Sequence, residues 1–423
     1  MRENIKETRL ENGLTVLSDS MSEVRSATLG FFFRVGSRNE PDELNGITHF
    51  IEHCVFKGGK KRSAREIAVE QDRLGGNLDA FTTHEETGFI IKVTDDRLDA
   101  AFDLVTDMLV HPHFDEADLK NEQRVIIEEI KMLDDSPEEV LGDMFHRDFF
   151  PGHQLGMAIT GTPETVRTFD AATTRMYHRS AFAPRNLVVV AAGNVDHDHL
   201  LRLCENLFPH DATNPIEQVA VKPPPTASPF IIKRREDLEQ AHLIIATPFI
   251  NARDPRRYAA DLLTNAIGGG TSSRLWQKIR EDRGLAYSVG ASASMFNDTA
   301  FFAISAATSP EQIGEVVELS IAEMRDVAAN GISQEELDLM KEQTRASILL
   351  SLEDSAARAA TLAHAELVHG RQIELEETLA NLDAVTTDDL NAVAREFFVT
   401  GKIAFAAIGD IDENAVTPEM LLI

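Results

Sequence analysis

Two histidines and a glutamate within five residues have the types and spacing of a metal site. His49 and His53 stand four positions apart, and Glu52 lies between them. On a helix all three side chains share one face, so both imidazoles can reach the same ion. Neutral imidazole is a preferred zinc donor, and a carboxylate that lies beside zinc without binding it can accept a proton from zinc-held water. The pattern predicts a zinc centre with a general base.

Among chains of this length and composition, about one in twenty-five would contain such a motif by chance. A third ligand is therefore needed to support the assignment. The segment 118–130 contains neither Gly nor Pro and is expected to be helical. Glu122 and Glu129 are two turns apart on one face of that helix. Glu128 is rotated about 100° from Glu129, so only one of these two neighbours can face the same way as Glu122.

The segment Gly46–His53, with Phe56–Gly58 after it and a glutamate further along the chain, resembles the M16 peptidases. Pitrilysin, insulin-degrading enzyme and the mitochondrial processing peptidase belong to this family, whose motif is the inverted zincin H-x-x-E-H. The resemblance implies that a carboxylate seven residues before the third ligand orients a histidine by accepting its other ring N–H. The roles it assigns are zinc ligands His49, His53 and Glu129, general base Glu52, and orienting carboxylate Glu122.

A second segment, residues 279–289, resembles the arginine–tyrosine element of the same family, and it follows a matching glycine-containing run at 268–275. The resemblance implies that Arg280 holds a substrate carbonyl and that Tyr287 donates a hydrogen bond to the oxyanion formed when water attacks. Without the resemblance, the two residues would be read as a surface arginine and a half-buried tyrosine. The glycine run is not a phosphate loop, because no Gly-Lys-Ser/Thr follows it.

The segment 78–85 alternates its side chains as an edge strand does. In the family this strand receives an extended substrate by adding the peptide's backbone to the sheet. The substrate-binding residues implied are Asp79, Ala80, Phe81 and Thr82. Asp79 stands where the commoner family pattern has Asn, and an ionised Asp cannot donate a hydrogen bond. A purely structural edge strand is the alternative.

Composition limits the remaining classes. The chain has 423 residues, 43% of them hydrophobic, which suffices for two or three domains. It contains no apolar run of 18 residues and begins with a polar, acidic segment unlike a signal or transit peptide, so we expect a cytoplasmic, bacterial protein without a membrane span. Cys54 and Cys204 are the only cysteines, so no disulfide framework is expected, and Cys54 is interpreted as a packed thiol.

The net charge of −29 argues against nucleic acid or an anionic membrane as a partner. It suits a basic peptide substrate. The alternative is that the acidic surface only maintains solubility.

The order of elements suggests an internal duplication. Buried strands expected at 28–35 and 186–193 correspond to strands at 241–248 and 402–409, and a helix at 257–267 takes the place of the zinc helix. That second helix lacks H-x-x-E-H, so one zinc per chain is expected. A proline-rich linker at 211–229 would separate an N-terminal domain (1–210) from a C-terminal domain (230–423).

These features predict an α+β fold with two similar domains, each a mixed sheet flanked by helices. Together with the resemblance they predict a zinc endopeptidase that cleaves extended peptides by metal-activated water attack. The resemblance implies that two such chains form a homodimer with a clamshell chamber. Two alternatives remain open: a catalytically silent scaffold, and one subunit of a hetero-oligomer.

Overall fold

The computed structural model of the chain describes residues 4–205, 207–208 and 223–423. These residues form two compact units. The first comprises the described parts of 1–132, 157–220 and 348–374, and the second comprises those of 133–156, 221–347 and 375–423. Each unit therefore contains a segment from the other half of the sequence. The linear division at 1–210 and 230–423 stays a prediction, and most of the expected linker lies outside the described residues.

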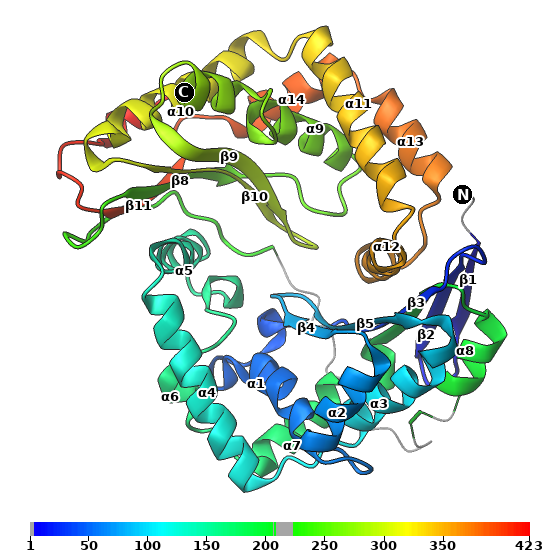
Figure 1. Ribbon diagram of the computed structural model, residues 1–423. Helices are drawn as coiled ribbons and strands as arrows, with labels where there is room; N and C mark the ends of the chain where they lie inside the picture. The colour runs from blue at the N-terminus through cyan, green and yellow to red at the C-terminus, as the bar shows by residue number, and fades with distance from the viewer. Residues whose placement is uncertain (1–3, 206, 209–222) are drawn as a thin grey trace. The chain divides into compact units, whose positions relative to one another are not determined.

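The first unit is built on a six-stranded mixed sheet of order β1-β2-β6-β3-β5-β4 (Figure 1). β2 and β6 pair in parallel and all other neighbours are antiparallel. Every residue of β6 is buried, as expected for a strand covered on both faces. The strands are β1 Ile5–Arg9, β2 Thr15–Ser20, β3 Ser26–Phe33, β4 Leu78–Thr82, β5 Thr87–Thr94 and β6 Leu187–Gly193.

Alternate side chains of β3 enter two different cores. Phe31 and Phe33 pack against helices on one face of the sheet, whereas Phe32 packs on the other face against Leu362 of α12. A strand directs successive side chains to opposite faces, so both sets of apolar residues need a cover. The helices of this unit are α1 Ile47–Cys54, α2 Ala64–Leu74, α3 Leu98–Val110, α4 Glu116–Asp134, α6 Pro163–Val166, α7 Ala171–Ala181, α8 His197–Cys204 and α12 Ser355–His369.

The second unit contains a five-stranded mixed sheet of order β7-β11-β8-β10-β9 (Figure 1). α5 covers one face of this sheet: Phe145 and Phe149 pack against Phe301 and Ile408. The strands are β7 Phe230–Arg234, β8 Ala241–Pro248, β9 Ala286–Met295, β10 Ala300–Thr308 and β11 Ala404–Gly409. The helices are α5 Pro137–Phe149, α9 Arg257–Gly268, α10 Ile313–Asn330, α11 Gln334–Ser351, α13 Leu375–Ala384 and α14 Thr387–Phe397.

The two sheets share one topology. Without β1, the order β2-β6-β3-β5-β4 of the first sheet matches the order β7-β11-β8-β10-β9 of the second. Each sheet contains one parallel pair, β2 with β6 and β7 with β11. α9 packs against β9 as α1 packs against β4. The expected α+β class and the repeated order of elements are therefore confirmed. No helix among the described residues is long and apolar enough to cross a lipid bilayer.

A buried ion pair fastens α12 to the first sheet. Asp19 of β2 and Arg358 of α12 are hydrogen-bonded and each side chain is 2% exposed. We expect Asp19→Asn to lower the free energy of unfolding by about 3–5 kcal/mol, because the guanidinium stays buried without its counter-charge. Urea denaturation followed by circular dichroism measures this.

The matched control is Asp410→Asn. Asp410 pairs with Arg234 at 3.1 Å, but both side chains are about half exposed. Exposed pairs contribute less than about 1 kcal/mol. Equal losses in the two variants would contradict the role given to the buried pair.

Candidate metal centre

The position where α1 begins is fixed by a close backbone approach. Gly46 has a φ of +93°, and a Cβ there would lie 2.6 Å from the Thr160 carbonyl oxygen and 2.7 Å from Gly161 Cα. Only glycine fits this conformation and this space. The buried Glu40 carboxylate accepts the backbone N–H groups of Gly46 at 2.7 Å and Thr48 at 2.8 Å. It thereby satisfies donors of the first turn, which lack partners within the helix.

Burial raises the pKa of Glu40 to about 7, although the hydrogen bonds from Thr48 and Gly46 oppose that rise. Because Glu40 is buried, the backbone N–H groups of Gly46 and Thr48 rather than water hold its side chain in place.

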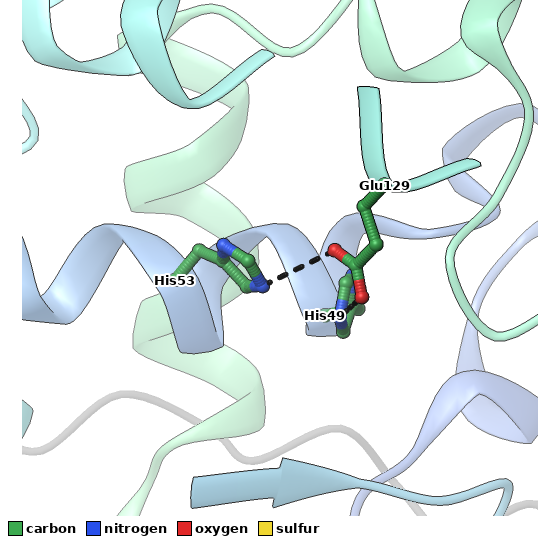
Figure 2. Close-up of side chains that lie close together, drawn as sticks. All are labelled: His49, His53 and Glu129. Carbon is green, nitrogen blue, oxygen red and sulfur yellow. Dashed lines mark ion pairs between the residues drawn. The ribbon is translucent and has the colours of Figure 1, made fainter. Parts of the chain in front are cut away.

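α1 and α4 bring three candidate ligands together (Figure 2). Glu129 Oε1 lies 3.8 Å from His49 Nε2, and Glu129 Oε2 lies 3.6 Å from His53 Nε2. The donor atoms of these residues all lie within 4.8 Å of one another. Glu128, the alternative considered from the sequence, points elsewhere: its side chain is 71% exposed and pairs with Lys131 at 2.7 Å.

The cluster has the properties of a zinc donor set. His49 Nδ1 and Glu129 Oε2 are buried and have no hydrogen-bond partner among the described residues. Buried polar atoms are normally bonded, so the unpartnered Glu129 oxygen fits a residue that ligates an ion. Burial, together with the neighbouring His53, lowers the pKa of His49 to about 4. The imidazole is then neutral at neutral pH, as a metal ligand must be.

Glu122 and Lys57 orient the second histidine. Glu122 Oε2 lies 3.4 Å from His53 Nδ1, and Glu122 Oε1 lies 2.7 Å from Lys57 Nζ. Burial alone would lower the pKa of His53, but Glu122 and the charges of Glu129 and Glu52 outweigh it and raise that pKa. With Nδ1 turned to Glu122, Nε2 faces Glu129 and is the atom available to a metal.

Glu52 lies on the same helix and is linked to the edge strand. Its buried carboxylate accepts a hydrogen bond from the Thr82 hydroxyl at 2.7 Å. Burial raises the pKa of Glu52, and the Thr82 bond opposes that rise. Since Thr82 ends β4, a candidate base and a candidate substrate strand are in direct contact.

β4 forms the edge of the first sheet among the described residues and pairs only with β5. The four residues implied in substrate binding, Asp79, Ala80, Phe81 and Thr82, make up most of this strand. Asp79 is exposed and accepts a hydrogen bond from the Asn77 side chain. The edge position suits strand addition, and the role of these residues in substrate binding stays a prediction.

Arg280 and Tyr287 belong to the second unit and contact each other. The guanidinium carbon of Arg280 lies over the Tyr287 ring, 4.6 Å from its centre. Tyr287 is 80% exposed, so it is not the half-buried tyrosine of the alternative interpretation. The candidate zinc ligands belong to the first unit, and the action of Arg280 and Tyr287 on a substrate stays a prediction.

Two family models match consecutive parts of the chain. Residues 15–163 match the insulinase family, peptidase family M16, and residues 168–344 match the peptidase M16 inactive domain. The chain belongs to peptidase family M16. The first match contains His49, Glu52, His53 and Glu129, and the second contains Arg280 and Tyr287.

Relatives from several bacteria are similar over nearly the whole chain. One from Streptomyces coelicolor, described as an uncharacterized zinc protease, is 38% identical and covers 93% of this chain and 87% of its own. Another of the same description, from Bacillus subtilis, is 35% identical and covers 93% and 96%. The crystal structure of a protease from Helicobacter pylori, 22% identical, has a TM-score of 0.87 over 96% of this chain and 99% of its own, which shows the shared fold.

Four contacts around the candidate metal centre and the arginine–tyrosine element were not predicted from the sequence. Glu40 caps α1 from outside the motif, and no spacing signal marks it. Lys57 lies in the segment that carries the resemblance, but its pairing with Glu122 depends on how α4 packs. The sequence suggested only a backbone role for Thr82, but its hydroxyl donates to Glu52. The centre of the Trp276 ring lies 4.0 Å from the Arg280 guanidinium carbon.

We expect Gly46→Ala to reduce zinc affinity at least tenfold, because the added methyl group must displace the first turn of α1 and with it His49. Gly75→Ala is the matched control. Gly75 also has positive φ, +68°, but a Cβ there meets no atom within 4 Å. The control should therefore lose only about 1–2 kcal/mol of stability from the left-handed backbone and keep its zinc. Zinc content after equilibrium dialysis distinguishes the two, and equal retention would contradict the steric argument.

Proposed function

We propose that this chain is a zinc-dependent endopeptidase that cleaves extended peptides. The observation that carries the proposal is the cluster of His49, His53 and Glu129, with the buried carboxylate of Glu52 beside it. The relatives described as zinc proteases support it. The described residues contain one such group of candidate ligands, in keeping with one zinc per chain.

His49, His53 and Glu129 would hold the metal. Bound zinc supplies a Lewis acid that lowers the pKa of water to about 7. Glu52 accepts the proton of the attacking water and delivers it to the leaving amine, and the Thr82 hydroxyl fixes the orientation of its carboxylate. Glu122 and Lys57 hold the His53 ring so that Nε2 faces the ion.

The substrate would bind as an added strand along β4, because an edge strand offers unpaired backbone groups to a partner. Arg280 would hold a peptide carbonyl, and the exposed Tyr287 hydroxyl would donate to the oxyanion. Strand addition requires an extended segment, which favours unfolded peptides over folded proteins.

A homodimer in the cytoplasm of a bacterium is part of the proposal. The competing scaffold hypothesis expects loss of zinc residues, whereas His49, Glu52, His53 and Glu129 are all present. Mass measurement of the purified chain separates a homodimer from a subunit that needs a different partner. Incubation with a mixed peptide library, with and without a chelator, tests the activity itself.

Glu52→Gln should keep one zinc per chain and lose peptide hydrolysis by about 10²–10⁴-fold, because glutamine is nearly isosteric but cannot accept the water's proton. Glu129→Gln should instead lose zinc. Zinc content by atomic absorption and hydrolysis of a quenched fluorescent peptide measure both effects.

Glu128→Gln is the control on the adjacent position. Its side chain is exposed and paired with Lys131, so both zinc and activity should match the unaltered protein. Loss of zinc in Glu128→Gln with retention in Glu129→Gln would contradict the ligand assignment.

The net charge of −29 leads us to expect faster cleavage of basic than of acidic peptides of equal length at low salt. Rising ionic strength screens exposed charges beyond about 10 Å at 0.1 M, so the difference should shrink as salt increases. The measurement is kcat/KM for the two peptides across a salt series. Equal values that do not depend on salt would leave the acidic surface with a solubility role only.

A further inference from the structure

The arginine–tyrosine element of the second unit contains a second cation–aromatic contact, made by Trp276. The guanidinium carbon of Arg280 lies over the Trp276 ring at 4.0 Å from its centre, closer than its 4.6 Å to the Tyr287 ring. Trp276 is the only tryptophan in the chain. A cation over the face of tryptophan is the strongest of the cation–aromatic contacts.

This contact lies within an irregular helical turn. Residues Trp276–Glu281 form one turn of π-helix, in which the Asp282 N–H bonds to the Gln277 carbonyl five residues earlier. Single π-turns inside helices are frequent at functional sites. Ile279 is fully buried and anchors the turn.

The indole ring is itself held in place. Its Nε1–H donates to Glu281 Oε1 at 3.2 Å, and that oxygen lies 4.0 Å from Arg280 Nε. The ring is half-buried, whereas Leu275 and Ile279 on either side of it in sequence are fully buried. Leu275 and Ile279 therefore provide the fully buried anchors of this turn, and Trp276 is not one of them.

The Arg280 side chain has an ion pair with Glu281 at 4.0 Å, which is longer than a hydrogen bond, so its N–H donors remain available to a ligand. An arginine side chain has about 2 kcal/mol of rotamer entropy. If the side chain is mobile before binding, this entropy is lost when an acceptor binds. Stacking on aromatic faces restricts the guanidinium plane before a ligand arrives and leaves the in-plane donors free.

We infer that Trp276 is a positioning residue, which holds the Arg280 guanidinium ready for a peptide carbonyl or carboxylate. The inference rests on the proposed function, because it assigns Arg280 to peptide binding. Trp276 acts through Arg280 and does not touch the substrate.

The test measures binding rather than turnover. The full chain carrying Glu52→Gln and loaded with zinc is titrated against a fluorescein-labelled, lysine-rich unstructured peptide, with anisotropy as the readout. Trp276→Leu should weaken binding about three- to thirtyfold, the range of a cation–aromatic contact, and Trp276→Phe should weaken it less because a ring face remains.

Two further variants separate positioning from a structural effect. In an Arg280→Ala background, Trp276→Leu should change the Kd by a factor close to one, because the group it positions is gone. Tyr258→Leu removes a contact of the same kind, Arg257 over Tyr258 at 4.5 Å, elsewhere in the second unit, and should leave the Kd unchanged.

Each outcome decides the inference. Equal weakening by Trp276→Leu with and without Arg280 would overturn it and assign Trp276 a structural role. No effect of Trp276→Leu on binding would overturn it as well. Failure of the parent Glu52→Gln protein to bind any peptide would overturn both the inference and the proposed function, whereas peptide binding with no Trp276 effect would overturn the inference alone.

Discussion

The N-terminal end of α1, at Gly46, lies close against the backbone of Thr160 and Gly161, and this contact constrains the whole candidate centre. No side chain fits between Gly46 and that loop, so α1 has one position in the unit. Glu40 then holds the first turn from the buried side. His49, Glu52 and His53 follow within seven residues, and a helix transmits a displacement of its first turn to all of them. The positions of these side chains thus depend on a backbone contact that includes none of the candidate ligands.

The second level of organisation is the packing of α4 against α1. Glu129 completes the candidate ligand set while Glu122, two turns earlier, reaches the far nitrogen of His53. One helix therefore carries both a candidate ligand and the carboxylate that contacts another candidate ligand. Lys57 balances the charge of Glu122 and keeps it an acceptor, since interaction with His53 and Lys57 lowers the pKa of Glu122 despite its burial.

Local pattern was enough to predict much of this arrangement. The helical face shared by Glu122 and Glu129 follows from a period of 3.6, and the β4 strand follows from alternation. The buried strand β6 follows from a continuous apolar run, and the structure contains all three. Contacts between distant segments leave no such pattern. Neither the Glu40 cap nor the pairing of Lys57 with Glu122 could be predicted, because each depends on how separate elements pack. The π-turn at Trp276–Glu281 was also missed, since one extra residue in a helical turn has no sequence signature of its own.

The exchange of α5 and α12 between the two units has a consequence for synthesis of the chain. The second face of the first sheet, with Phe32, Val188 and Val190, is covered by residues 355–369. During translation that apolar face is complete long before its cover leaves the ribosome, and α5 is made before the strands it covers. Domains usually fold in order as they emerge, but here neither half can bury its sheet until nearly the whole chain is available. Nascent chains of this fold therefore carry exposed apolar sheet while the residues between β6 and α12 are made, and a chaperone that binds such surfaces has that interval in which to act.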